Sequence, residues 1–323
     1  MSPAVHRLEI PTPFLVGRVN CYLLTGDPLT LVDTGPNSGT ALDTLEQSLA
    51  EHGVAIEDLE LVVLTHQHMD HGGLLEVIAR RSGAQVAAFA PLIPWLANYT
   101  ASATADDNFA QALMRRHGVP DEIVTVLGLV AAAYRGYGSK CAVTRPLADG
   151  DALTMGGRQF VVLHRPGHSP SDLAFFDQHA GLLIGGDHLI GHISSNAIVT
   201  RPFGGAVDAP RPRPLMQYVS SLQATRAMEL SEVLAGHGDP VTEHRALIDE
   251  RMRLHQRRAA KIMAMLSPEP LTAHQLAGRI WGNVAVTQAY LTLSEVLGHI
   301  DLLLAGDKVM EVDDGSVTRF RAR

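Results

Sequence analysis

The sequence predicts a mixed α/β fold, because short apolar runs of strand length alternate with segments whose apolar residues recur at helical spacing. The chain of 323 residues is long enough for one large domain and a small one. Apolar residues make up 46% of it and charged residues 19%, which is ordinary for a protein with a sizeable core. We therefore expect a large domain over residues 1–249 and a small one over residues 250–323.

Turn and capping residues divide the first ninety residues into strands and helices. Apolar runs at residues 19–25 and 29–33 flank Gly26-Asp27-Pro28, a combination that predicts a hairpin. A helix is expected over residues 38–52, because Ser38 can cap its start. Residues 59–65 are mostly apolar, as in a strand covered on both faces. Further strands are expected at residues 85–89, 160–163, 173–176, 182–184 and 232–235, and further helices at residues 74–81 and 213–228.

Residues 91–146 differ in character and are interpreted as a helical insertion. The segment is rich in large apolar and aromatic residues, including Trp95, Tyr99, Phe109, Tyr134 and Tyr137. These rings would either form the insertion's own core or line the mouth of an active site. In the second case they would favour an apolar acyl or aryl substrate, since binding pockets are commonly lined in this way.

The last seventy residues read as a small separate unit. A basic helix is expected over residues 250–266, a capping box at Thr272 and Gln275, a longer helix over residues 286–304 and a β-hairpin over residues 308–321. Helix, helix, helix and hairpin is the order of a winged-helix module. Residues 285–300 hold no lysine or arginine, so we expect this unit to pack against the protein rather than to read DNA.

Histidines and aspartates gather at one point of the sequence. His66, His68, Asp70 and His71 lie within six positions, directly after the apolar run of residues 59–65. Imidazole and carboxylate groups are the ligands that Zn²⁺ and similar cations prefer. Packing or solubility does not explain such a cluster, and a structural zinc site would more often use cysteines. The cluster therefore predicts a metal site.

Three more strand ends carry the same chemistry. His168 follows Arg165-Pro166-Gly167, Asp187 follows Gly185-Gly186, and His237 lies between Gly236 and Gly238. Glycine lets the backbone approach a crowded site closely. We expect these loops to converge with the His66–His71 cluster at one edge of the sheets.

With these motifs the chain resembles the metallo-β-lactamase superfamily, whose pattern is an early aspartate, HxHxDH, and then a distant histidine, aspartate and histidine. The resemblance covers roughly residues 5–245 and implies an αββα sandwich with a dinuclear metal centre. By position, it implies that the first metal is held by His66, His68 and His168, the second by Asp70, His71 and His237, that Asp187 bridges the two, and that Asp33 orders the ligand loops without touching metal. Two divalent cations are expected per chain, Zn²⁺ in first place, with iron or manganese as alternatives.

The chemistry that follows from this arrangement is hydrolysis. Zinc lowers the pKa of a bound water from about 16 to about 7, and the resulting hydroxide would attack a carbonyl or phosphoryl centre while Asp70 accepts or relays a proton. We expect a small-molecule ester, thioester or lactone as the substrate, for example a thioester of the glyoxalase II type. A phosphodiesterase or endoribonuclease is the alternative, followed by iron-dependent oxidation and by metal binding without catalysis. An aspartate at the bridging position, rather than a cysteine, disfavours β-lactam cleavage.

Three residues near these motifs are candidates for binding substrate. His188 and His192 follow Asp187 and would line the pocket, although ordinary polar loop residues would look the same. Arg165 would hold a substrate carboxylate or phosphate, or else form a surface salt bridge. Arg201, Arg211 and Arg213 form a loose basic stretch that is more typical of a solvated loop.

Composition limits the partners and the compartment. The net charge is −8, which gives no global attraction to nucleic acid or to an anionic membrane. The two cysteines, Cys21 and Cys141, have no CxxC partner and are expected to be buried small hydrophobes in a reducing compartment. The start of the chain shows no secretory signal. We expect a cytoplasmic protein that acts on a small molecule, with a homodimer as one assembly.

Overall fold

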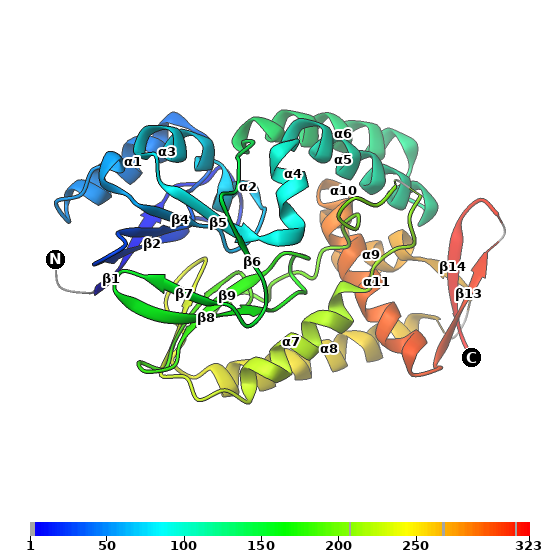
Figure 1. The fold of residues 1–323 in the computed structure, drawn as a ribbon. Helices are drawn as coiled ribbons and strands as arrows, with labels where there is room; N and C mark the ends of the chain where they lie inside the picture. Colours follow the sequence, from blue (N-terminus) through cyan, green and yellow to red (C-terminus); the bar gives the residue numbers. More distant parts are fainter. Residues whose placement is uncertain (1–3, 207, 267–268, 314) are drawn as a thin grey trace.

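Two β-sheets face each other, and helices cover both outer faces in the computed structural model (Figure 1). The structure describes residues 4–206, 208–266, 269–313 and 315–323. Within these ranges, no helix combines the length and apolar character needed to cross a bilayer. The αββα layering expected from the sequence is confirmed.

The first sheet is built from six strands in sequential order. Its strands β1, β2 and β3 run antiparallel, and β3, β4, β5 and β6 run parallel. The bounds are β1 Ala4–Ile10, β2 Val19–Thr25, β3 Thr30–Val32, β4 Leu61–Val63, β5 Gln85–Phe89 and β6 Arg145–Leu147. Helices α1 (Gly39–Ala50) and α3 (Leu75–Ser82) cover its outer face through buried residues such as Leu45 and Ile78. Ser38 caps α1 as predicted, since its side chain accepts a hydrogen bond from the Ala41 amide.

The second sheet has the strand order β11-β10-β9-β8-β7. Its bounds are β7 Ala152–Met155, β8 Arg158–His164, β9 Leu173–Asp177, β10 Leu182–Gly186 and β11 Glu232–Ala235. Neighbours are antiparallel except β10 and β11, so β8, β10 and β11 point the same way and end at the same edge. Helices α7 (Pro214–Arg226) and α8 (His244–Leu266) cover its outer face. Figure 1 shows them on the opposite side from α1 and α3.

The two sheets meet in a continuous apolar layer. Both contribute fully buried side chains, such as Val63 and Leu24 from the first and Phe160, Phe175 and Ile184 from the second. This burial is the main stabilising contribution, at about 25 cal/mol per Å² of apolar surface. The layer holds the strand ends of both sheets in one arrangement.

The predicted insertion is helical. Between β5 and β6 it contains η2 (Ala90–Leu92), α4 (Ile93–Ala97), α5 (Tyr99–Arg116), α6 (Asp121–Tyr134) and η3 (Arg135–Tyr137). The C-terminal region contains β12 (Leu271–Thr272), α9 (Ala273–Trp281), α10 (Val284–Thr287), α11 (Ala289–Ala305), β13 (Val309–Asp313) and β14 (Thr318–Ala322). Phe109 and Val124 of the insertion lie in one buried cluster with Leu297 of α11 and Phe320 of β14. The insertion's core is therefore shared with the C-terminal region.

Several predicted details are corrected by the structure. Strands β1, β6 and β7 were not predicted; each lies at the edge of its sheet, where a half-exposed strand shows little apolar patterning. The helix predicted over residues 286–304 is broken at Gln288, whose φ of −124° is not helical. The domain boundary predicted after residue 249 falls inside α8, so both regions share this helix, and the division into two domains stays a prediction. Both cysteines are buried and free, as predicted.

The shared cluster predicts cooperative unfolding of the insertion and the C-terminal region. Phe109→Ala should lower the free energy of unfolding by about 3–5 kcal/mol, because it opens a cavity in the common core. The two tryptophans report on the two regions separately, since Trp95 lies in α4 and Trp281 in α9. In denaturant titrations of single-tryptophan variants, both reporters should shift to the same lower midpoint. A shift confined to Trp95 would contradict a shared core.

Candidate metal centre

Loops from both sheets bring the predicted ligand residues together. His66 and His68 follow β4, and Asp70 and His71 lie in the short helix α2 (Met69–Gly72). His168 lies between β8 and β9. Asp187 follows β10 and His237 follows β11. All seven side chains belong to three overlapping groups whose ligand atoms lie within 4.8 Å of one another: His66, His68 and His168; His66, His71 and Asp187; and Asp70, His71 and His237.

The first of these groups consists of three imidazole side chains. The Nε2 atom of His66 lies 3.0 Å from Nδ1 of His68, which in turn lies 2.9 Å from Nε2 of His168. In each of these two contacts, at least one of the two nitrogens carries no proton. A cation placed among the nitrogens would stabilise their lone pairs, which otherwise face one another. The set of three nitrogens fits Zn²⁺, which is commonly bound by histidine.

Asp187 lies between the first group and the third, which consists of Asp70, His71 and His237. One carboxylate oxygen, Oδ1, is 3.3 Å from Nε2 of His71. The other, Oδ2, is 3.4 Å from Nε2 of His168 and 3.5 Å from Nε2 of His237. Nε2 of His237 is also 3.4 Å from Oδ2 of Asp70. A carboxylate that reaches ligands of both groups is the arrangement a bridging residue requires.

A glycine allows this close approach. A Cβ atom at Gly236 would collide with Oδ1 of Asp187 and would lie 2.8 Å from Cε1 of His71. The backbone of Gly236 also accepts a hydrogen bond from Asn20 and donates one to Gly186. Any side chain at this position would therefore push two candidate ligands apart.

The outward-facing nitrogens of four histidines are held by hydrogen bonds. Nδ1 of His168 donates to the carbonyl of Asn196 at 3.0 Å, and Nδ1 of His237 donates to the carbonyl of Arg18 at 2.7 Å. Nδ1 of His71 lies 2.8 Å from Oδ2 of Asp33, and Nδ1 of His66 lies 3.0 Å from Oγ1 of Thr65. Such contacts select the tautomer that leaves Nε2 without a proton and facing a metal.

Asp33 organises ligands of both groups. Its Oδ2 accepts from Nδ1 of His71 and, at 2.8 Å, from the Thr65 hydroxyl, which is then free to accept from His66. Its Oδ1 accepts from the Thr65 amide at 2.9 Å. Asp33 is 2% exposed and has a φ of 60°, a left-handed conformation that aspartate and asparagine tolerate better than most residues. The predicted placement of Asp33 behind the ligands agrees with this geometry.

The electrostatics of the centre hold some of the candidate ligands in the protonation state that binds metal and keep two histidines protonated. Burial and the neighbouring imidazoles hold the pKa of His66 well below its usual value and lower the pKa of His68 to about 3. Burial opposes ionisation of Asp187, but His71 and His237 overcome this and hold its pKa well below the usual value. Despite burial, Asp187 raises the pKa of His71 and brings that of His237 to about 9. Without metal these two histidines hold protons that a cation would replace.

Unpartnered buried atoms give an independent test of metal fit. Nε2 of His71, Nε2 of His237 and Oδ1 of Asp187 are buried and make no hydrogen bond within the described part of the chain. Leaving such atoms unpaired is costly, since buried polar groups are normally satisfied. All three belong to the candidate groups, so the residues present fit divalent cations.

The three predicted substrate-binding residues lie in different surroundings. His188 is 1% exposed, and its Nε2 lies 2.8 Å from the Thr225 hydroxyl, so its side chain faces the protein interior and the predicted contact with substrate is not supported. His192 is exposed and lies next to Gly238. Arg165 is partly buried, and its Nε has no partner among the described residues. Substrate binding by His192 and Arg165 stays a prediction.

Sequence reasoning missed the contacts that orient the histidines. Thr65 adjoins the ligand cluster and could have been noticed as a polar residue at the end of a buried strand. Arg18 and Asn196 act through backbone carbonyls, which every residue type has, so no sequence signal identifies them. The solvated loop expected at Arg201, Arg211 and Arg213 is wrong for two of them, since Arg201 pairs with Asp106 at 2.8 Å and Arg211 with Asp301 at 2.6 Å. Arg213 is exposed, as expected, and lies 3.8 Å from Asp301.

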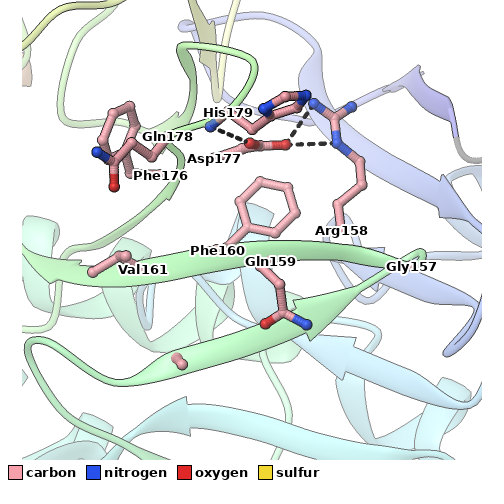
Figure 2. Close-up of a pocket in the computed structure, with 10 residues that line it drawn as sticks. Gly157, Arg158, Gln159, Phe160, Val161, Phe176, Asp177, Gln178 and His179 are labelled. Atoms are coloured by element: carbon pink, nitrogen blue, oxygen red, sulfur yellow. Dashed lines mark hydrogen bonds and ion pairs between the residues drawn. The ribbon is translucent and has the colours of Figure 1, made fainter.

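A pocket lies at the ends of β8 and β9 that are far from His168 (Figure 2). There Arg158, Asp177 and His179 point toward one another. Oδ2 of Asp177 accepts from Arg158 at 2.7 Å, and Oδ1 accepts from the His179 amide at 2.9 Å. The charges in this pocket are thus paired within the protein.

Asp33→Asn should weaken metal binding. Asparagine suits the left-handed backbone and has the same shape, but its amide has only one oxygen. Its NH2 group must then face either the Thr65 amide or the pair formed by His71 and the Thr65 hydroxyl, and all of these are donors. We expect the affinity for the bound metals to fall about 10- to 100-fold, the usual effect of losing such a partner. Competition with a chromophoric chelator measures this, and Asp43→Asn on the exposed face of α1 is the control. Equal affinities in both variants would contradict the assigned role.

Comparisons with known proteins agree with this site. The metallo-beta-lactamase superfamily model matches residues 15–237, which include all seven candidate ligands. The probable metallo-hydrolase YqjP of Bacillus subtilis (strain 168) is 34% identical over 317 residues, covering 98% of this chain and 97% of that protein. The human acyl-coenzyme A thioesterase MBLAC2 is 27% identical over 183 residues, covering 53% of this chain and 58% of that protein.

A solved structure extends the similarity to the whole chain. A metallo-beta-lactamase family protein from Thermus thermophilus superposes with a TM-score of 0.82 at 27% identity, covering 99% of this chain and 98% of that one. The family match, the curated relative and the structural similarity agree with the fold and with the cluster of histidines and aspartates. The chain belongs to the metallo-beta-lactamase superfamily.

Proposed function

We propose that this protein uses two divalent cations, Zn²⁺ in first place, to hydrolyse a small-molecule ester, thioester or lactone. The observation that carries the proposal is the meeting of seven ligand side chains in overlapping groups, with Asp187 between the two sets of histidines. In this proposal the first cation is held by His66, His68 and His168, the second by Asp70, His71 and His237, and both by Asp187. Nitrogen and carboxylate ligands without cysteine suit a catalytic rather than a structural zinc site.

When bound, the cations would polarise the scissile carbonyl and make a water molecule acidic near neutral pH. The chain's own residues position these partners and handle protons. Asp70 is 8% exposed, and its Oδ2 is 3.4 Å from His237. Burial opposes its ionisation, but the nearby His71 outweighs this and lowers the pKa of Asp70, so the carboxylate is available to accept a proton.

Aromatic rings beside the metal centre support an apolar acyl group in the substrate. The ring of Phe14 lies 5.6 Å from that of Tyr134 and 5.9 Å from that of Tyr137. Phe14 is on the β1–β2 loop, the same loop whose Arg18 carbonyl holds His237. One turn before Tyr134 on α6, Val130 is 43% exposed, which leaves apolar surface on the same face of the helix. The name of the MBLAC2 relative, an acyl-coenzyme A thioesterase, points to the same bond type.

Arg165 is proposed to bind an anionic part of the substrate. It lies three residues before His168, and burial lowers the pKa of its guanidinium while leaving its Nε without a partner among the described residues. A partly desolvated arginine of this kind binds carboxylate or phosphate more strongly than an exposed one. His192, on the exposed side of Gly238, is kept as a second candidate.

The C-terminal region is proposed to be a winged-helix-like unit with a packing role. Helix α11 is buried along most of its length and contacts α5, α7, α8 and α9. An endoribonuclease or phosphodiesterase is the second candidate function, and it would need a basic groove that α11 does not provide. The homodimer and the cytoplasmic location expected from the sequence stay predictions.

A substrate panel tests the proposal. The purified protein, with its metal content measured, is offered acyl thioesters of increasing chain length, a lactone, a phosphodiester and a β-lactam. We expect the longer acyl thioesters to be hydrolysed with the highest kcat/KM, and all activity to disappear on chelation and return with Zn²⁺. Preference for the phosphodiester would favour the second candidate function, and activity without metal would exclude the proposal.

Asp70→Asn should reduce kcat about 10²- to 10⁴-fold, which is the usual contribution of a positioned acid or base. Because Asp70 is also a proposed ligand, turnover is compared with the wild type at equal metal content, measured on the same samples. Asp239→Asn, at an exposed position near the same loops, serves as the control. Undiminished turnover of the Asp70 variant at full metal content would remove Asp70 from the proton transfer.

A further inference from the structure

The segment between β10 and α7 touches two of the candidate ligands. It follows Asp187, and its described part covers residues 188–206 and 208–213. The Ser195 hydroxyl donates to the backbone carbonyl of Asp187 at 2.5 Å. The next residue, Asn196, accepts a hydrogen bond from Nδ1 of His168 through its backbone carbonyl at 3.0 Å. The position of this segment therefore affects one ligand of the first group and the residue between the groups.

Helix α11 of the C-terminal region holds the same segment. The side-chain amide of Asn196 donates to the carbonyl of Leu291 at 3.0 Å. Three residues later, the amide of Val199 donates to the Ser294 hydroxyl at 3.2 Å, and the Val199 carbonyl accepts from the Tyr290 hydroxyl. Val199 and Ser294 are fully buried, so the bond between them is shielded from water, whereas the bond from Asn196 to Leu291 is exposed.

Two ion pairs fix the remainder of the segment. Arg211 makes two hydrogen bonds of 2.6 Å to the carboxylate of Asp301, which lies on α11 and is fully buried. Arg201 pairs with Asp106 of α5 at 2.8 Å. Paired arginine–carboxylate bonds of this geometry are strong and directional. The segment is thus attached to α11 at both ends and to α5 in between.

Asn196 connects α11 with the metal centre by two bonds from one residue. Its side chain is bound to α11, and its backbone carbonyl is bound to His168. The carbonyl can only accept, so it selects the His168 tautomer with the proton on Nδ1 and leaves Nε2 for metal. A histidine ligand loses affinity when the group behind it moves, because ring direction and tautomer are no longer held.

We propose that Asn196 is a positioning residue through which α11 orients His168 in the first metal group. The inference rests on the proposed function, since it assumes that His168 binds a cation. It assigns the C-terminal region a direct part in building the metal centre, beyond its packing role. The affinity for the ion at His66, His68 and His168 should depend on this link. The affinity for the ion at Asp70, His71 and His237 should not.

Metal titrations of the full-length protein test the link. Asn196→Ala removes the bond to Leu291 and leaves the backbone carbonyl in place. We expect one of the two Zn²⁺ ions to bind about tenfold more weakly, at the lower end of the range for lost supporting contacts. In the Co²⁺-substituted protein, the absorption bands should shift in the same direction as in His168→Ala, which marks the loss of the first group. Ser294→Ala should produce a smaller change in the same ion.

Asn98→Ala is the matched control. Its side chain also donates to a backbone carbonyl, that of Pro94, at 3.1 Å, but in the insertion. Wild-type affinity of both ions in Asn196→Ala, or equal weakening of both ions, would overturn the inference. If Asn196→Ala does not fold, Ser294→Ala decides by the same two readouts. A wild-type protein that binds no divalent cation would instead exclude the proposed function itself.

Discussion

Ionisable side chains that are buried together, with polar atoms left unpaired, impose the strongest constraint on this structure. Burying an imidazole or a carboxylate without a partner costs a protein several kcal/mol, and here Nε2 of His71, Nε2 of His237 and Oδ1 of Asp187 share one site. Cation binding would offset this cost and make the folded state more stable. Until then, the surrounding scaffold must hold the ligand loops in place by itself.

The two-sheet fold holds the ligand loops in place because strands from both sheets end at one edge. Strand β4 comes from the first sheet, while β8, β10 and β11 come from the second, and the apolar layer between the sheets fixes their relative positions. Local contacts then orient the ligand side chains. Asp33 accepts a left-handed backbone to reach Thr65 and His71, and Gly236 omits a side chain so that Asp187 and His71 can approach. Strain and small residues gather at the site because function, and not packing, requires them.

The insertion and the C-terminal region act together as a second layer of support. They share one buried cluster, and α11 holds the segment that passes behind His168 and Asp187. The region that resembles a DNA-binding module in its order of elements is therefore bound into the enzyme through buried contacts. Two aromatic rings of the insertion lie outside this cluster, since Tyr134 and Tyr137 contact Phe14. Phe109 therefore belongs to the shared core, and a role of the other rings at the mouth of an active site stays a prediction.

The candidate ligands could be predicted from the sequence, because residue types and their spacing are local properties: His66, His68, Asp70 and His71 follow one strand, and His168, Asp187 and His237 follow three others. Strong apolar runs also predicted β2, β5 and β11 with their observed bounds. The groups that stand behind the ligands could be identified only from the fold. The carbonyls of Arg18 and Asn196 leave no mark in a sequence, since every residue has one and only position in the fold makes it useful. For the same reason His188 turned inward to Thr225: whether a polar side chain faces a pocket or the core depends on what packs around it.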